Sequence, residues 1–168
     1  AIHDPGDKVL FGVPLAGRAE AAGIDEGVEA IDRILARPEC AQFIAGKLAV
    51  WLVHPQPDPS KVDALAAVLV ANDYSIRAML HALFRSEWFY APENRFALYQ
   101  NPVELVVGSA RRLEIQNPHL AGLERHARRM GMDLLSPPSV AGWDHGEAWI
   151  NSSATVARLQ VALELSEL

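Results

Sequence analysis

The feature that most constrains the fold of this chain is a series of apolar stripes at helical spacing, separated from one another by proline. Between residues 76 and 84, apolar side chains recur at three- and four-residue intervals, as they do on one face of an α-helix. A similar stripe follows Asp25 and stops at the Arg37-Pro38 step, because the residue before a proline disfavours helical backbone. This second stripe consists of Val28, Ile31, Ile34 and Leu35. Successive stripes of this kind predict several short helices whose apolar faces close over a common interior.

Capping residues indicate where the helices begin. The Asn-Pro-Val-Glu segment at residues 101–104 places a cap, a first-turn proline and a carboxylate in order, which predicts a helix from there to about residue 115. Asp25 is expected to cap the helix that follows it, and Asp73 or Ser75 the helix that ends at residue 84. Two further helices are predicted at residues 39–54 and from the capping-box sequence at residues 60–63 to residue 71. Another is predicted from Asn117-Pro118 to Gly131. The last predicted helix begins at Ser152 or Ser153 and has Val156, Leu159 and Leu163 on one face.

The segment before the first helix has a different period. In residues 8–16 every second side chain is apolar, which is typical of a short half-buried strand or hairpin. We therefore expect a mainly α fold, an irregular bundle of six or seven helices with a short N-terminal β hairpin. A long Trp-containing loop over residues 133–151 precedes the last helix. Neither a repeat nor a shift in composition marks a second domain, so residues 1–168 are expected to form a single helical domain.

Composition excludes several classes of protein. Half of the residues are hydrophobic and 21% are charged, which is the composition of a folded chain rather than a disordered one. The formal net charge of −6 opposes binding to nucleic acid, whose phosphates require basic surfaces. The single Cys40 rules out an internal disulfide and a Cys-rich zinc site. The longest apolar run, residues 64–71, is shorter than the ~20 residues of a membrane-spanning helix. We therefore expect neither nucleic-acid binding nor membrane insertion.

The long loop before the last helix concentrates aromatic and polar side chains between glycines. Trp143 and Trp149 could stack on a sugar or another flat ligand, with hydrogen bonds from Asp144, His145 and Asn151. In the alternative interpretation, both indoles fill the helical core and the polar groups cap the last helix. These five residues are candidate ligand contacts under the first interpretation and structural residues under the second.

A second candidate site combines two His-Asp pairs. His3 and Asp4 would join Asp144 and His145 in a mixed imidazole and carboxylate metal site if the N-terminal turn folded back onto the long loop. Neighbouring residues lack the i, i+4 spacing that aims two ligands at one point, and an aspartate before Pro-Gly is typical of a plain turn. The sequence therefore predicts no metal and no other cofactor, and it leaves His3 and Asp4 as candidate ligand contacts.

No catalytic motif stands out elsewhere. The chain has no Gly-x-Ser-x-Gly turn, Cys40 has no paired histidine, and the carboxylates are scattered rather than paired. The basic residues between positions 111 and 129 could dock an anionic partner. However, Arg125, Arg128 and Arg129 share one helical face, as on a solvated surface. Catalytic residues are thus not assigned from the sequence.

Several motifs, taken in order, resemble one bacterial family. They are His3-Asp4-Pro5-Gly6-Asp7-Lys8, Leu83-Phe84-Arg85-Ser86-Glu87-Trp88-Phe89, Asn101-Pro102-Val103-Glu104, Pro137-Pro138-Ser139-Val140-Ala141-Gly142-Trp143 and Trp149-Ile150-Asn151-Ser152-Ser153. They are similar to the C-terminal part of proteins in the domain of unknown function 1800 family, and the resemblance covers nearly the whole chain. It implies a mainly helical fold, an exported bacterial setting and a longer parent protein, which agrees with a chain that begins at Ala1 without a leader.

These observations together lead us to expect a non-catalytic helical interaction or scaffold module, the C-terminal fragment of a larger exported protein. Its partner would be another protein or the N-terminal part of the same longer chain. Two alternatives stay open. One is part of a hydrolase-like enzyme, with or without metal assistance, whose site is completed by the N-terminal region. The other is a carbohydrate-binding surface built on Trp143 and Trp149.

Overall fold

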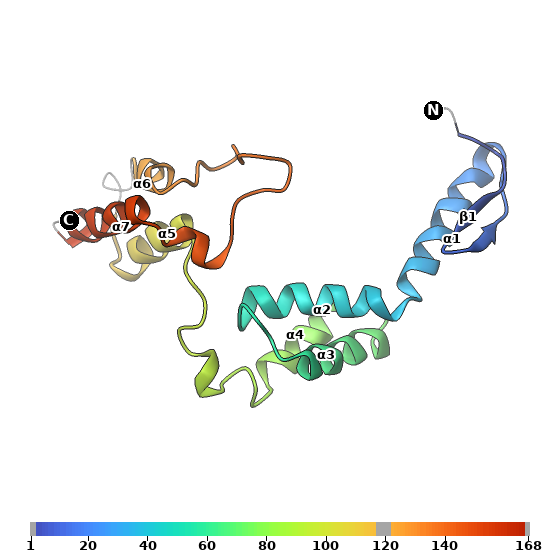
Figure 1. Ribbon diagram of the computed structural model, residues 1–168, viewed down its shortest axis with the longest axis horizontal. Helices are drawn as coiled ribbons and strands as arrows, with labels where there is room; N and C mark the ends of the chain where they lie inside the picture. The colour runs from blue at the N-terminus through green and yellow to red at the C-terminus, as the bar shows by residue number, and fades with distance from the viewer. Residues whose placement is uncertain (1–2, 117–121, 167–168) are drawn as a thin grey trace. The chain divides into compact units, whose positions relative to one another are not determined.

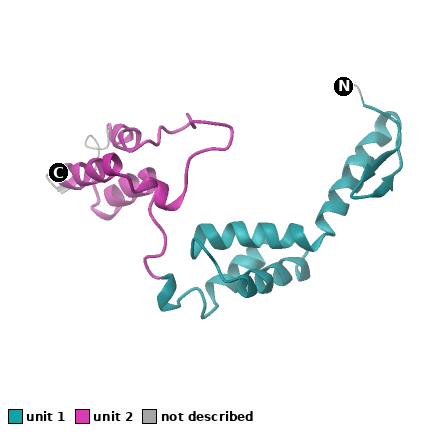
Figure 2. Ribbon diagram, in the orientation of Figure 1, with its two compact units in different colours: residues 1–94 teal, residues 95–168 magenta. Residues whose placement is uncertain are grey.

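Seven α-helices and one two-stranded hairpin make up the regular structure of the described residues, 3–116 and 122–166, in the computed structural model (Figure 1). The predicted mainly α fold with an N-terminal hairpin is confirmed. No described helix combines the length and the apolar character that crossing a bilayer requires. The chain divides into two compact units, Ala1–Asn94 and Arg95–Leu168, which Figure 2 colours separately. A single domain over residues 1–168 stays a prediction.

The first unit begins with the hairpin. Strands β1 (Lys8–Leu10) and β2 (Val13–Leu15) pair antiparallel. Phe11 and Gly12 form the two-residue turn between them, and both have positive φ. This backbone conformation favours glycine and matches the twist of the paired strands. The predicted hairpin is confirmed, but the predicted burial of its alternating side chains is wrong for Val9, Phe11 and Val13, which are exposed, and right for Leu15.

Helix α1 (Gly23–Leu35) follows a short 3-10 turn at Glu20–Ala22. The helix begins before its predicted cap, because Asp25 lies inside the first turn and the N-cap position, Ala22, offers no side-chain hydrogen bond. The Asp25 carboxylate still favours the helix there, since the first turn carries the positive end of the helix dipole. The helix ends before Pro38, as predicted.

The core of the first unit lies among helices α2 (Pro38–Leu52), α3 (Pro59–Ala71) and α4 (Ile76–Phe84), which pack together (Figure 1). Leu69, Met79 and Leu83 are fully buried at its centre. Ala41 and Ala45 line the buried face of α2, and side chains this small allow a neighbouring helix to approach closely. A short 3-10 turn at Pro92–Asn94 ends the unit.

Two caps in this unit test the predicted helix starts. The Ser60 amide donates to Asp58 Oδ1 at 2.8 Å, so Asp58 caps α3 and the predicted capping box at residues 60–63 is wrong. Pro59 explains the shift, because proline fits the first helical position and the cap is the residue before it. Ser75 Oγ accepts from the Ala78 amide at 3.3 Å, so Ser75 rather than Asp73 caps α4.

The second unit contains helices α5 (Pro102–Arg112), α6 (Leu123–Arg129) and α7 (Ser152–Ser166), with a 3-10 turn at Gly146–Trp149 before α7. The capping box of α5 is confirmed. The Glu104 amide donates to Asn101 Oδ1 at 2.8 Å, and the Asn101 amide donates to Glu104 Oε2 at 3.0 Å. Helix α5 ends short of the predicted limit near residue 115. Helix α6 ends just before Gly131, as predicted, whereas its predicted start at Asn117-Pro118 lies outside the described residues.

Helix α7 buries the face opposite to the predicted one. Its predicted interior residues Val156, Leu159 and Leu163 are exposed. The residues that it buries are Ala154, Ala157, Val161 and Leu165. Both faces of this helix are apolar, so spacing alone does not decide which face lies inside. The observed face contains two alanines, whose small side chains allow close packing against the other helices of the cluster that Val106 and Met130 complete.

Two valines of α7 test this assignment, because they have the same chemistry and differ in burial. Val161 is 3% exposed and Val156 is 56% exposed. We expect Val161→Ala to lower the free energy of unfolding by about 2 kcal/mol, through lost burial and a residual cavity. Val156→Ala should change it by less than about 0.5 kcal/mol. Urea unfolding of both variants measures the difference, and a larger loss at Val156 would contradict the observed face.

Candidate functional site

A charged side chain, the carboxylate of Glu26 on α1, is buried in the first unit. Glu26 is 4% exposed, and it is the one buried charged residue among those that the structure describes. A carboxylate removed from water is strongly unfavourable unless charges and hydrogen-bond donors surround it. The groups around Glu26 therefore show how the hairpin segment is attached to α1.

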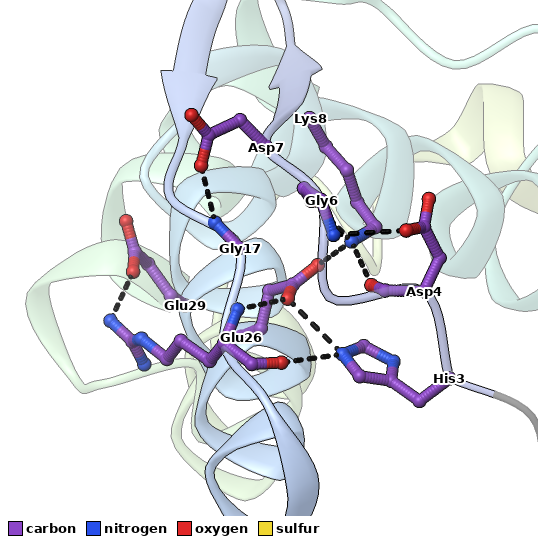
Figure 3. Close-up of polar contacts among 9 residues, drawn as sticks. His3, Asp4, Gly6, Asp7, Lys8, Gly17, Glu26 and Glu29 are labelled. Atoms are coloured by element: carbon purple, nitrogen blue, oxygen red, sulfur yellow. Dashed lines mark hydrogen bonds and ion pairs between the residues drawn. The ribbon is translucent and has the colours of Figure 1, made fainter.

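Three groups from the segment before α1 hold Glu26 in place (Figure 3). Lys8 Nζ lies 2.6 Å from Oε1, the Arg18 amide donates to Oε2 at 3.2 Å, and His3 Nε2 lies 3.3 Å from Oε2. Lys8 Nζ also donates to two carbonyl oxygens of the turn before β1, at 2.7 and 3.0 Å. We call His3, Lys8, Arg18 and Glu26 the Glu26 network. One lysine thus ties the buried carboxylate to the turn that leads into the hairpin.

The sequence candidates His3 and Asp4 both lie at this network. His3 Nε2 lies near two hydrogen-bond acceptors, Glu26 Oε2 and, at 3.1 Å, the carbonyl oxygen of Arg18. The exposed Asp4 side chain accepts from the Gly6 amide at 2.9 Å. That is the turn role typical of an aspartate in this position.

Gly17 brings the two ends of the hairpin segment together. Its amide donates to Asp7 Oδ1 at 2.9 Å (Figure 3). A Cβ at this position would lie 2.1 Å from the carbonyl oxygen of Pro5, so this close approach requires glycine. The next residue is Arg18, and the close approach therefore places its amide where Glu26 can accept from it.

A second layer of ion pairs continues along the same face of α1. Glu29 accepts from Arg18 Nη2 at 2.7 Å and from Arg33 Nη2 at 2.6 Å. The Arg33 guanidinium also donates to the carbonyl oxygens of Val13 and Pro14, at 3.2 and 2.9 Å. The polar face of α1 is therefore attached to β2 as well as to the turn before β1.

The electrostatics of the network favour an ionised Glu26. The hydrogen bond from Lys8 is the main cause that lowers the pKa of Glu26, and burial acts in the opposite direction. The Arg18 amide and the charges of Lys8 and His3 lower this pKa further. At neutral pH the carboxylate is charged, so an ion pair joins the hairpin to α1.

This arrangement reverses the usual orientation of an amphipathic helix. The charged side of α1 faces the hairpin, whereas Ile24, Val28, Ile31 and Ile34 are 74%, 52%, 57% and 41% exposed. We call these four residues the outward face of α1. The prediction that the stripe from Val28 to Leu35 closes over the interior is wrong for Val28, Ile31 and Ile34, whereas Leu35, its last residue, is half-buried. The spacing correctly identified which residues of α1 share a face, but the polar face is the one that contacts the hairpin.

An open cavity of about 370 Å³ lies between the hairpin and α1. Lys8 and Glu26 contribute to its wall, together with the apolar side chains of Leu10, Leu15 and Ala30. Its lysine and carboxylate are paired with each other. The charges of the wall therefore hold the hairpin against the helix instead of facing an empty binding position.

The tryptophans of the long loop lie in the second unit. Trp149 is 7% exposed, and its ring lies beside Gly131, after α6. Trp143 is half-buried, and its indole nitrogen is buried without a hydrogen-bond partner among the described residues. Trp149 is thus part of the interior of the second unit.

The polar candidates of this loop have different surroundings. Asn151 Oδ1 accepts from the Ala154 amide at 2.9 Å and from Ser153 Oγ at 2.8 Å, which is the geometry of a helix cap at the start of α7. Asp144 and His145 are exposed. His3 and Asp4 belong to the first unit and Asp144 and His145 to the second. Among residues 3–116 and 122–166, no group of three or more His, Cys, Asp or Glu side chains is placed to hold a metal ion.

Comparison with known proteins identifies the family. A family model described as "Protein of unknown function (DUF1800)" matches residues 1–167. The chain belongs to the DUF1800 family. No curated protein and no solved structure matches it.

Sequence reasoning on this DUF1800 chain found His3 and Asp4 but missed Glu26 as their partner. The signal that was available is the polar row Glu26, Glu29 and Arg33, which recurs at three- and four-residue intervals opposite the apolar stripe. A row of this kind is normally solvated, so it did not stand out. Its burial depends on Lys8, which lies eighteen residues earlier in the chain.

Acidification tests whether the Glu26 network stabilises the DUF1800 fold. Because the folded state lowers the pKa of Glu26, its charge contributes stability that is present above the ordinary carboxyl range of about 4 to 5 and is lost as the pH falls through the lowered pKa. We expect Glu26→Gln to be less stable than the wild type at pH 7, and the difference to shrink toward pH 3. Urea unfolding across this range measures it. The exposed control Glu87→Gln should follow the wild type, and equal curves for both variants would count against the network.

A pair of tryptophans tests the structural role of the loop. Trp149→Ala removes a buried indole and should lower the free energy of unfolding of the second unit by about 3 to 5 kcal/mol. Trp51→Ala, at a position that is 68% exposed, should cost less than about 1 kcal/mol. Hydrogen exchange of the α5 and α7 amides reports on the second unit directly. Unchanged protection in Trp149→Ala would show that the ring does not belong to the interior.

Proposed function

We propose that this DUF1800 chain is a non-catalytic helical interaction module, and that the outward face of α1 binds a separate partner protein. The observation that carries the proposal is the orientation of α1. Its ion pairs face the hairpin, and four large aliphatic side chains face away from it. Contiguous exposed apolar patches often mark protein interaction sites.

The side chains of the outward face are spaced as in a ridge that packs against another helix. Ile24, Val28 and Ile31 follow one another at four- and three-residue intervals, so their side chains form one continuous row. Full burial of a single aliphatic side chain of this size is favourable by about 1.5 to 3 kcal/mol. A partner that covers the row therefore gains enough free energy to offset part of the loss of freedom on association.

The other two functions receive less support. An enzyme fragment would need a reactive group that is accessible, whereas the Glu26 carboxylate is buried and already accepts from the Arg18 amide and pairs with Lys8. A carbohydrate platform needs open ring faces, whereas Trp149 is buried. The family resemblance supports an exported bacterial setting and a longer parent protein, and these belong to the proposal.

Site-specific cross-linking tests the proposed surface. A photo-reactive amino acid replaces Val28, which is 52% exposed, in the full-length protein as its own cells produce it. The matched control replaces Val70 on α3, which is 53% exposed. We expect a single adduct with a different protein from position 28 and none from position 70.

The partner identified by mass spectrometry is then purified and mixed with the purified protein. Its binding should weaken at least tenfold in Ile31→Asn, which replaces an exposed aliphatic side chain of the outward face with a polar one. Equal adducts from both positions, no adduct at all, or unchanged binding to Ile31→Asn would each refute the proposed surface.

A further inference from the structure

We infer that the segment which occupies the outward face of α1 is an amphipathic helix with basic side chains along one edge. This inference rests on the proposed function and specifies the chemistry of the partner. Its basis is the distribution of charge beside the apolar row. Asp25 and Asp32 are exposed and lie two helical turns apart on the same side of the row.

The two edges of the outward face differ in charge. Asp25 precedes Val28 by three residues and Asp32 follows it by four, so both carboxylates flank the same central side chain. The opposite edge is formed by Gly27 and Ile34, which are uncharged. A partner helix therefore meets acidic groups along one edge only, and this asymmetry fixes the edge at which its own lysines or arginines are favourable.

Asp25 and Asp32, which form the acidic edge of the outward face, make no ion pair within the described part of the chain. Every ion pair of α1 involves Glu26, Glu29 or Arg33, on the side that faces the hairpin. Asp25 favours its own helix, because it lies in the first turn. Asp32 has the opposite effect, since a carboxylate in the last turn meets the negative end of the helix dipole. The position of Asp32 therefore does not favour its own helix, and its exposed carboxylate is accessible to a basic partner.

The same charges argue against the two other occupants of an apolar helix face. Helices that lie on membranes carry lysine and arginine beside their apolar face, because the headgroups are often anionic, whereas α1 carries Asp25 and Asp32 there. A second copy of α1 packed antiparallel would place identical acidic edges next to each other, and like charges repel. A basic amphipathic helix satisfies the apolar row and the acidic edge together.

Two designed peptides test the inference on the intact protein. Both are amphipathic helices with the same leucine row, and one carries lysines along its edges where the other carries glutamates. We expect fluorescence anisotropy at low salt to show that the lysine peptide binds at least tenfold more tightly. The double variant Asp25→Asn with Asp32→Asn should bind the lysine peptide about three- to tenfold more weakly than the wild type, which corresponds to loss of two exposed ion pairs.

The matched control changes the net charge equally at another surface of the same unit. Glu87→Gln with Glu93→Gln removes two exposed carboxylates and should leave binding of the lysine peptide unchanged. Ile31→Asn should weaken the binding of this peptide at least tenfold, because binding also requires the apolar row.

The outcomes separate this inference from the proposed function. Equal binding of both peptides, or an affinity unaffected by Asp25→Asn with Asp32→Asn, would overturn the charged edge and leave an apolar docking surface. Failure of both peptides would overturn the helical partner, while a cross-linked protein at position 28 would still support the proposed function. Binding to phosphatidylglycerol vesicles, or self-association that Ile31→Asn abolishes, would assign the face to a membrane or to a second copy and overturn both.

Discussion

The buried Glu26 carboxylate is the constraint on which the architecture of the N-terminal segment depends. Its ion pair with Lys8 and its hydrogen bond from the Arg18 amide join the turn before β1, the segment after β2 and α1. Removing the Lys8 ammonium while the hairpin stays in place would leave Glu26 as an unpaired charge in a water-poor site, which is strongly unfavourable. The three parts therefore keep one relative orientation, and the direction of the opposite side of α1 follows from it.

The orientation of α1 is unusual, because the hydrophobic effect normally buries the apolar side of a helix and leaves the charged side in water. A two-stranded hairpin is too small to bury a full helical stripe, and this one leaves Val9 and Val13 exposed on its own surface. Besides the buried side chain of Leu15, the hairpin contributes charge and backbone acceptors, through Lys8 and the carbonyl oxygens that Arg33 contacts. The ion pairs stabilise the layer, and the apolar side chains of α1 stay available. Exposure of these apolar side chains is unfavourable in an isolated chain. Association with another helix would remove them from water.

The sequence predicted where helices begin and end better than which face they bury. Local signals are sufficient for the first task at α5, because Asn101 and Glu104 satisfy each other's amides and Pro102 stands in the first turn of the helix, as predicted. Burial depends on contacts between residues that are distant in the chain. The inward face of α7 follows from its packing with Val106 and Met130, and the inward face of α1 follows from Lys8. A spacing pattern assigns residues to a face but contains no information about these partners.

The same reasoning explains why the conspicuous residues of the sequence and the proposed interaction surface do not coincide. Tryptophan and asparagine in a loop that contains glycines attract attention, yet Trp149 fills an interior and Asn151 caps α7, both of which are local requirements of the fold. The outward face consists of isoleucine and valine, residues that ordinarily indicate a core. Only the knowledge that Glu26 occupies the inner side converts this apolar row into a candidate binding surface. In a helix that carries charges on one side and aliphatic groups on the other, the location of the counter-charges therefore determines which face stays exposed.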